Sequence, residues 1–600
     1  MIAVASRNLG ATLPETSMFT TRPELLGTFG ATASTHWLSA TTGMGVLERG
    51  GNAFDAAATM GFVQQVVEPQ RNGPGGEVPI LFHQVGKDGV RAISGQGVAP
   101  AAATVERYRG LGLDLIPGTG FLAATIPGPF DAWMVLIRDR GTLPLRAILE
   151  PAIALAEKGY PITPRIAVAI AKVADVFRTD WPTSAALYLP NGEPPKAGTY
   201  FRNPALARAW KRLIEEGEAA GSDRVRQIEA ARRAWSQGFV AEAIERFVRT
   251  PVKDTSGRAH AGLITADDLA RWQAKEEAPI TYDYGRYTVA KCGTWSQGPV
   301  FLQQLALLKG KDLAKLDPNG AEFVHLCIEA TKLAFADRNA YYGDPDFVDV
   351  PMGALLSDAY NAERRKRITD KAAMDTPPGV VPGYQPNVAK LKHSPEIALE
   401  PHWKAAMPAD TVHLDVIDRH GNMVSATPSG GWLPSSPVIP ELGFPLGTRG
   451  QIFSLDPKHP NALAPGKRPR TTLTPSLALR DGKPYMAFGT PGGDQQDQWS
   501  LVMFLRHVHH GMNLQEAIDA PAFHTSHFES SFWPRGAEPG KVQIESRFGD
   551  AVAQDLRRRG HDVEIVDGWS EGNLSAISRE GEHLKAGANP RYMEGYAVCR

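Results

Sequence analysis

The chain has 600 residues, of which 42% are hydrophobic, and this is ample for a large buried core. The 64 Lys and Arg residues balance 65 Asp and Glu residues to a net charge of −1, so the composition predicts neither a nucleic-acid partner nor binding to an anionic membrane surface. Three cysteines that lie far apart argue against a disulfide scaffold and fit a reducing compartment.

The N-terminal stretch from Met1 to Arg22 has no apolar core of signal-peptide length. No run of about 18 apolar residues occurs in the sequence, so no membrane span is predicted. We therefore expect a cytoplasmic protein without a membrane partner. A periplasmic location, reached with a leader that has since been trimmed, stays open.

The first clear helix signal is the stretch Gly50–Ala58, where a glycine turn leads into an alanine-rich helix with Asn52 as its expected N-cap. A glycine-rich loop follows over 68–77, and a strand is predicted over Val78–Phe82. A phosphate-cradling loop is the alternative interpretation of 68–77. It is not adopted, because no Gly-Lys-Ser/Thr follows the glycines.

Charged, helical sequence fills residues 160–260, and its charges are expected mostly on solvated helix faces. A capping signal from Thr265 to Asp268 predicts another helix start, and His325 to Tyr342 predicts a long helix. Repeated prolines then break residues 371–410, which are expected to form a loop or linker. An internal cut would be tolerated at the end of such a segment.

A predicted β-hairpin follows directly, between Asp410 and Ser429. Its two strands pair symmetrically about a tight turn, so that Ile417 faces Met423. The same register places Thr411 opposite Ser429, give or take one step. The hairpin therefore predicts that two hydroxyl groups meet at the start of its first strand.

Thr411 in this position has the features of an N-terminal nucleophile. If the chain is cut before Thr411, the new α-amine, with an ordinary pKa of about 8, becomes the base for its own hydroxyl. Ser429 would hold that amine in place. The alternative is an ordinary hairpin that happens to begin with threonine.

Two later stretches were weighed as functional sites. Gly489–Gly493 follows a predicted strand, Tyr485–Phe488, and is either a plain strand-to-helix turn or a source of backbone N–H donors for an anion. The histidines in His507–His510 precede Gly511, and no carboxylate or cysteine pattern completes a zinc site with them. We interpret them as charges and caps at a helix C-terminus, and no metal is predicted.

The hairpin resembles the start of the small subunit of γ-glutamyltransferases (glutathione hydrolases), which are self-cleaving Ntn hydrolases. That family has a Thr-x-His start, an Asp-x-x-Gly-Asn turn and a Val-Ser/Ala-x-Thr return. The matching positions are Thr411 with His413, then Asp418, Gly421 and Asn422, and finally Val424–Thr427. The resemblance covers most of the chain, from about Ala31 to Tyr596, and includes the Gly50–Ala58 stretch.

The resemblance implies an α/β fold, a four-layer αββα sandwich, made as one precursor. Self-cleavage between Asp410 and Thr411 would give a large segment, 1–410, and a small segment, 411–600, which together form one interleaved heterodimeric unit. Thr411 would be nucleophile and base, Ser429 would position it, and the N–H groups of Gly492 and Gly493 would stabilise the oxyanion. The family needs no metal or organic cofactor.

The predicted substrate-binding residues include two departures from the family. Thr471 and Thr472 occupy its two-serine positions and keep the hydroxyls. Gln96 stands where the family has an arginine that grips the substrate α-carboxylate, and a neutral amide cannot make that bidentate pair. Ser454 falls near the acidic residue that holds the α-amine, unless Asp456 substitutes. Arg71 is the candidate for a replacement cation.

These departures favour an amidohydrolase or acyltransferase that acts on a small-molecule amide with a non-glutamyl acyl group. The first alternative is an authentic γ-glutamyltransferase or glutathione hydrolase with a rebuilt carboxylate site. The second is an unprocessed member that acts as a binding or scaffold protein. The sequence does not identify the acyl donor, and further dimerisation of the heterodimer stays open.

Overall fold

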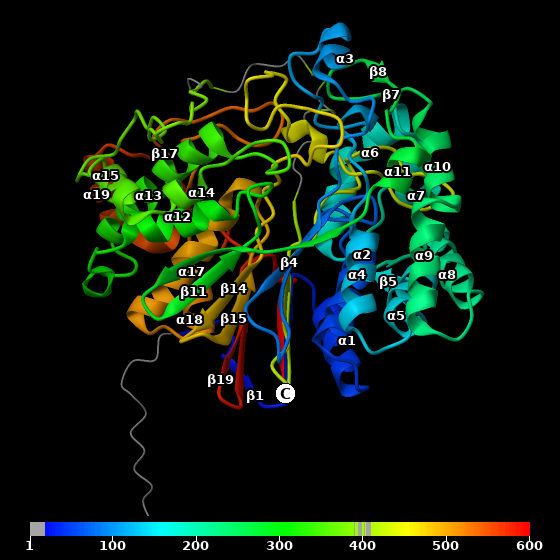
Figure 1. Ribbon diagram of the computed structural model, residues 1–600, viewed down its shortest axis with the longest axis horizontal. Helices are drawn as coiled ribbons and strands as arrows, with labels where there is room; N and C mark the ends of the chain where they lie inside the picture. Colours follow the sequence, from blue (N-terminus) through cyan, green and yellow to red (C-terminus); the bar gives the residue numbers. More distant parts are fainter. Residues whose placement is uncertain (1–18, 389–390, 394–398, 401–402, 404–409) are drawn as a thin grey trace, which may run out of the picture.

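The computed structural model describes residues 19–388, 391–393, 399–400, 403 and 410–600. Two large antiparallel sheets lie face to face between layers of helices, which is the four-layer α/β architecture expected from the sequence (Figure 1). No helix among the described residues is both long and apolar enough to cross a membrane. Part of the predicted linker, at 389–390, 394–398, 401–402 and 404–409, lies outside the described residues.

One seven-stranded sheet has the order β1-β20-β19-β15-β14-β11-β10. Its strands are β1 (Leu25–Gly27), β10 (Ile280–Tyr284), β11 (Tyr287–Lys291), β14 (Ser476–Arg480), β15 (Lys483–Gly489), β19 (Ser575–Glu580) and β20 (His583–Ala588).

The other seven-stranded sheet has the order β21-β2-β12-β13-β3-β4-β9. Its strands are β2 (Gly30–Ser34), β3 (Val78–His83), β4 (Arg91–Gly95), β9 (Lys275–Glu277), β12 (Leu414–Asp418), β13 (Met423–Ala426) and β21 (Tyr596–Cys599). Both sheets contain strands from before and after position 410, so the two predicted segments are interleaved.

The remaining strands form small sheets at the periphery. They are β5 (Tyr160–Pro161), β6 (Tyr200–Phe201), β7 (Val252–Lys253), β8 (Ala259–His260), β16 (Phe523–Thr525), β17 (Lys541–Glu545) and β18 (Asp562–Val566).

The helices of the first half of the chain lie mostly on the side of the sheet that contains β12 (Figure 1). They are α1 (Trp37–Glu48), α2 (Ala53–Val67), α3 (Val105–Gly110), α4 (Pro129–Arg140), α5 (Leu145–Lys158), α6 (Pro164–Thr179), α7 (Pro182–Tyr188), α8 (Pro204–Glu218), α9 (Arg224–Ser236), α10 (Phe239–Val248) and α11 (Ala266–Arg271). Of these, α1, α2 and α4 pack directly against the strands of that sheet.

The later helices cover the other sheet. They are α12 (Pro299–Leu308), α13 (Ala321–Tyr341), α14 (Met352–Leu355), α15 (Asp358–Arg365), α17 (Gln496–His510), α18 (Leu514–Asp519) and α19 (Gly549–Arg559).

Several local predictions are confirmed. Asn52 caps α2 through a capping box with Asp55, and Thr265 makes the same kind of box with Asp268 at the start of α11. Helix α13 spans the stretch predicted from His325 but begins earlier, at Ala321. The apolar core between the sheets consists mainly of small and branched side chains, which lets the two sheets pack closely.

His527 is a buried histidine that the fold holds neutral. Its Nδ1 accepts from the Gly540 N–H at 2.9 Å, while Nε2 lies 2.9 Å from Thr376 Oγ1. Burial, with a smaller effect from the charge of Lys332, lowers the pKa of His527 to about 3. Protonation of Nδ1 would also break the Gly540 hydrogen bond.

His527→Gln is expected to flatten the acid side of the stability curve. Between the unfolded pKa of about 6.5 and the folded value, the unfolded chain binds the extra proton, so His527 costs about 1.4 kcal/mol of stability per unit of falling pH. Urea unfolding at pH 7.0, 6.0 and 5.0 measures this. Equal slopes for wild type and variant would show that His527 ionises in the folded protein.

Candidate active site

The predicted hairpin register is confirmed. Ile417 pairs with Met423 in the β12–β13 ladder, and an antiparallel bridge joins Thr411 to Ser429. Asp418 organises the turn: its Oδ1 accepts the N–H groups of residues 420–422, and its Oδ2 accepts the Ala53 N–H at the start of α2. One carboxylate therefore fixes both the turn and the helix that covers it.

Thr411 is buried at the start of the hairpin, with only 3% of its surface exposed. Its Oγ1 lies 3.1 Å from Ser429 Oγ, so the two hydroxyls are within hydrogen-bond distance. The Thr411 N–H donates to Asp410 Oδ1 at 2.8 Å. The structure thus brings together the residues predicted as nucleophile, positioning group and cleavage site.

Two donors converge on the backbone carbonyl of Asp410. Ser429 Oγ–H donates to this oxygen at 3.1 Å, and the Trp432 indole Nε1–H donates at 2.5 Å. Trp432 is buried and was not predicted from the sequence. Its indole reaches the carbonyl only because the loop after Ser429 turns back, through Gly430 and Gly431 with φ of 73° and 61°.

A fully buried ion pair stands behind Ser429. Arg449 Nε donates to Glu77 Oε1 at 2.7 Å, and its Nη2 donates to Ser429 Oγ at 3.0 Å. Burial raises the pKa of Glu77, and the charge of Arg449 opposes that rise. Because a guanidinium only donates, the Ser429 proton stays available for the Asp410 carbonyl or the Thr411 hydroxyl.

Gly492 and Gly493 form the turn between β15 and α17. Their φ angles of 121° and 57° lie in the left-handed region, and a Cβ at Gly492 would fall 2.3 Å from Trp499. A Cβ at Gly493 would lie 3.0 Å from the Phe532 ring, and that same ring lies 5.5 Å from the Arg449 guanidinium. The glycine turn is therefore linked to the hairpin through Phe532 and through Arg449, which contacts Ser429, while the oxyanion role stays a prediction.

The two threonines predicted to bind substrate lie in the same network. Thr472 Oγ1 is 3.5 Å from Arg449 Nη1. The Thr471 N–H donates to the Trp295 carbonyl, and its buried hydroxyl has no hydrogen-bond partner within the described part of the chain. The role of both hydroxyls in substrate binding stays a prediction.

Gln96 and Ser454 are placed differently. Gln96 is fully buried, donates to the Gly97 carbonyl at 3.0 Å, and lines a cavity of about 420 Å³ whose lining does not include Thr411. The Ser454 hydroxyl accepts the Asp456 N–H at 3.1 Å and so serves a local turn. Neither contact supplies a charge for an amino-acid substrate.

Arg71 lies directly against the predicted cleavage site. Its Nε is 3.1 Å from Asp410 Oδ2, and its Nη1 donates to Glu68 at 2.9 Å. Arg165, which was not predicted, donates to the same Asp410 oxygen at 2.9 Å and stacks 3.6 Å from the centre of the Tyr592 ring. Two arginines therefore hold the Asp410 carboxylate.

Buried carboxylates surround Arg71. Burial, reinforced by nearby Glu594 and opposed by Arg71, raises the pKa of Glu68 to about 7. Glu594 Oε2 lies 3.6 Å from Arg71 Nη2, and Thr35 Oγ1 donates to Glu68 at 2.8 Å. Burial thus favours the neutral form of Glu68, and its ion pair with Arg71 favours the charged form.

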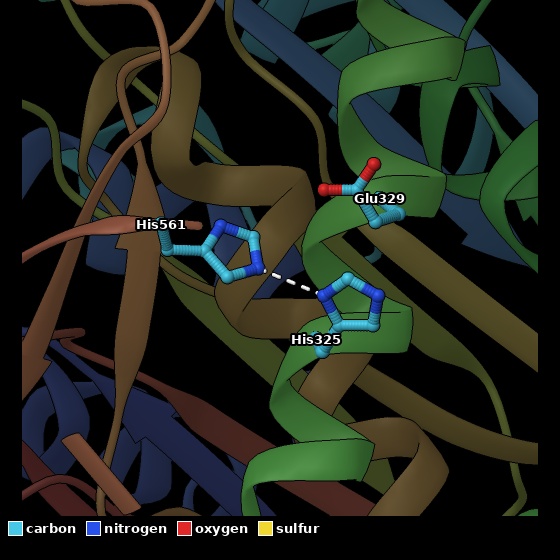
Figure 2. Close-up of side chains that lie close together, drawn as sticks. All are labelled: His325, Glu329 and His561. Carbon is cyan, nitrogen blue, oxygen red and sulfur yellow. Dashed lines mark hydrogen bonds between the residues drawn. The ribbon is translucent and has the colours of Figure 1, made fainter. Parts of the chain in front are cut away.

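The described residues include one His/Glu group with metal-ligand spacing, formed by His325, Glu329 and His561 (Figure 2). His325 Nδ1 faces His561 Nε2 at 2.8 Å, and Glu329 Oε1 accepts from Lys332 at 2.6 Å. The Lys332 ammonium already neutralises the carboxylate, so the group serves as a hydrogen-bonded junction. His507 and His509, considered above, bond separately to Tyr485 and Tyr284.

Comparison with known proteins places this site in context. The family model described as gamma-glutamyltranspeptidase matches residues 39–599. The oxamate amidohydrolase proenzyme of Klebsiella pneumoniae is 32% identical over 588 residues, covering 96% of this chain and 99% of its own.

Two solved structures match almost the whole chain. LmbA2991HD has 54% sequence identity and a TM-score of 0.92, with 97% of this chain and 100% of that chain covered. The cephalosporin acylase from Bacillus halodurans has 30% identity and a TM-score of 0.82, with 99% of each chain covered. The four-layer fold and its two large sheets are therefore shared with an acylase.

Replacing Arg449 tests the buried pair behind Ser429. Arg449→Met leaves the Glu77 carboxylate buried without its partner, and a loss of about 3–5 kcal/mol in unfolding free energy is expected. Glu77→Gln combined with Arg449→Met removes the stranded charge, so the double variant is expected to recover a large part of that loss. Urea unfolding compares the two; a double variant as unstable as the single would contradict this explanation.

Proposed function

Since the chain belongs to the gamma-glutamyltranspeptidase family of Ntn hydrolases, we propose that it is an enzyme that cleaves itself before Thr411 and then hydrolyses or transfers a non-glutamyl acyl group from a small-molecule amide. The observation that carries this proposal is the geometry at residue 410. Thr411 Oγ1 meets the Ser429 hydroxyl, and the Asp410 carbonyl receives two donors.

Self-cleavage begins with attack of Thr411 Oγ on the Asp410 carbonyl carbon. The carbonyl oxygen becomes an oxyanion, which accepts from Trp432 Nε1–H and Ser429 Oγ–H. The C–N bond then breaks as the Thr411 hydroxyl proton passes to the Thr411 nitrogen, and an ester links the Asp410 carbonyl carbon to Thr411 Oγ. Water hydrolyses this ester, leaving a carboxylate on Asp410 and a free amine on Thr411.

Turnover reuses the same oxygen. The free α-amine of Thr411 accepts the hydroxyl proton as Oγ attacks the substrate amide, and then gives that proton to the leaving amine. The acyl-enzyme is released by water or by an acceptor amine. The backbone N–H groups of Gly492 and Gly493 are the proposed oxyanion donors, and the hydroxyls of Thr471 and Thr472 are the proposed contacts to the acyl group.

A non-glutamyl acyl group is favoured by the residues around the site. A γ-glutamyl donor carries an α-amine and an α-carboxylate, which call for an acidic and a basic partner. Gln96 is neutral and faces a different cavity, and the Ser454 hydroxyl is taken by a local turn. The relatives that match the whole chain include an oxamate amidohydrolase and a cephalosporin acylase, which act on other amides by their names.

The indole of Trp432 is expected to set the rate of self-cleavage. Trp432→Phe keeps an aromatic ring but removes the N–H, and loss of one oxyanion donor slows such steps by roughly 10²–10³-fold. The uncut chain, followed by denaturing gel after synthesis, measures the rate. Trp210→Phe is the matched control, because Trp210 is equally buried and its Nε1 has no hydrogen-bond partner among the described residues. Equal rates for Trp432→Phe and wild type would exclude the indole from the step.

γ-Glutamyl-p-nitroanilide separates the proposed specificity from that of an authentic γ-glutamyltransferase. We expect turnover of this substrate to be at least about 100-fold slower than that of the best acyl anilide in a panel, because a lost bidentate ion pair costs several kcal/mol. Release of p-nitroaniline is the readout. Robust turnover of the γ-glutamyl substrate would establish the alternative. A chain that stays as one band on a denaturing gel after long incubation would favour the unprocessed binding protein, and two fragments cut at Thr411 would remove that alternative.

A further inference from the structure

The Asp410 side chain is bound as a ligand would be bound. One of its carboxylate oxygens contacts two guanidinium groups, Arg71 Nε at 3.1 Å and Arg165 Nη2 at 2.9 Å. The other accepts the Thr411 N–H at 2.8 Å. The Arg165 contact is a charge-assisted hydrogen bond, and Arg71 adds an ion-pair contact without hydrogen-bond geometry.

Self-cleavage breaks the bond that holds Asp410 at this position. Within the described part of the chain, Asp410 is the only ion-pair partner of Arg165, whose side chain is about 29% exposed. Arg71 is fully buried and keeps Glu68 and Glu594, but its Nε has no contact with either. If Asp410 moves away after the cut, the Arg165 donor loses its acceptor and Arg71 Nε, which has no hydrogen-bond partner among the described residues, loses its nearby charge.

The position is partly exposed, because 25% of the Asp410 side chain and 29% of the Arg165 side chain are accessible. A surface cavity of about 740 Å³ is lined by Tyr592 and Glu594, among other residues. Tyr592 stacks on the Arg165 guanidinium, and Glu594 lies 3.6 Å from Arg71. Neither arginine lines this cavity, and they adjoin it only through Tyr592 and Glu594.

We propose that self-cleavage converts the Asp410 position into a carboxylate-binding subsite, formed by Arg71 and Arg165 beside the new α-amine of Thr411. The substrate is then an amide that carries a carboxylate. This inference rests on the proposed self-cleavage and adds the substrate class. In the uncut chain, the Asp410 carboxylate occupies the subsite and blocks substrate binding there.

The carboxylate can belong to either side of the substrate amide. Asp410 itself places its carboxylate three bonds from the carbonyl carbon, as a succinyl group does. The same position also adjoins the Thr411 nitrogen, which protonates the leaving amine. The subsite would bind the carboxylate in the same way in both cases, so the two cases are told apart by comparing substrates.

The test is binding of succinate, with succinamide as the neutral analogue of the same size, measured by isothermal titration calorimetry. Mature wild-type protein is expected to bind succinate at least about tenfold more tightly than succinamide. Thr411→Ala, which stays uncut with Asp410 in place, is expected not to bind succinate. Equal binding by mature and uncut protein, or no preference for succinate in the mature protein, would overturn the proposal.

Arg165→Gln, purified as the mature form, is expected to weaken succinate binding about tenfold or more. Arg146→Gln is the matched control, because Arg146 lies on the surface in an ion pair with Glu218. If the Arg165→Gln variant does not cleave itself, the comparison of succinate with succinamide binding to mature wild-type protein still tests the proposal. A wild-type chain that stays uncut on a denaturing gel refutes the proposed function itself. A cut chain without succinate binding refutes only the subsite.

Two pairs of substrates identify the side of the amide that carries the charge. Succinyl-p-nitroanilide against its succinamyl analogue tests the acyl side, and 4-acetamidobenzoate against 4-acetamidobenzamide tests the leaving amine. In one pair, kcat/KM is expected to be about tenfold or more higher for the carboxylate, and Arg165→Gln is expected to remove that preference through KM. If the neutral analogue in each pair is cleaved as fast as its carboxylate, the subsite does not contribute to turnover and the proposal is contradicted.

Discussion

The contact between the hydroxyls of Thr411 and Ser429 organises the site. It exists because the β12–β13 hairpin closes in a single register, fixed by Asp418 at one end and by the backbone pairing of Ser429 with Glu77 at the other. A shift of one residue would turn every side chain of the strand to the opposite face. Since both faces of β12 are buried, such a shift would exchange the side chains of the two packed faces and separate Asp415 from Ser575.

The Arg449–Glu77 pair shows how a buried charge can define a hydrogen-bond direction. A guanidinium cannot accept a hydrogen bond. Arg449 therefore donates to a lone pair of the Ser429 hydroxyl oxygen and leaves the hydroxyl proton unused. The serine proton must then point toward Thr411 or the Asp410 carbonyl. Burying such a pair gains little net stability compared with apolar residues, so its value here lies in orientation.

Much of the fold was predictable, because it depends on patterns that are local in sequence. The capping boxes of α2 and α11, the hairpin register and the glycine turn at 492–493 follow from residues within a few positions of one another. Trp432, Arg449 and Arg165 were missed because their partners lie far away in the sequence or on a loop whose path is set by packing. A buried arginine or tryptophan gives no signal by itself. Arg71 was proposed from the sequence as a cation that replaces the charge lost at Gln96; it lies against Asp410, and its role toward a substrate stays a prediction.

In this account, the residues that position the chain for self-cleavage also line the site that binds substrate in the mature enzyme. Ser429 contacts both the attacking oxygen and the carbonyl to be attacked, and Asp410 occupies the arginines next to them. The most direct measurement is intact mass, with N-terminal sequencing, of the purified wild-type chain beside Thr411→Ala. Two polypeptides, the smaller beginning at Thr411, are expected for wild type, and one of 64.9 kDa for the variant. An intact wild-type chain, or a cut at another bond, would contradict the role given to Thr411.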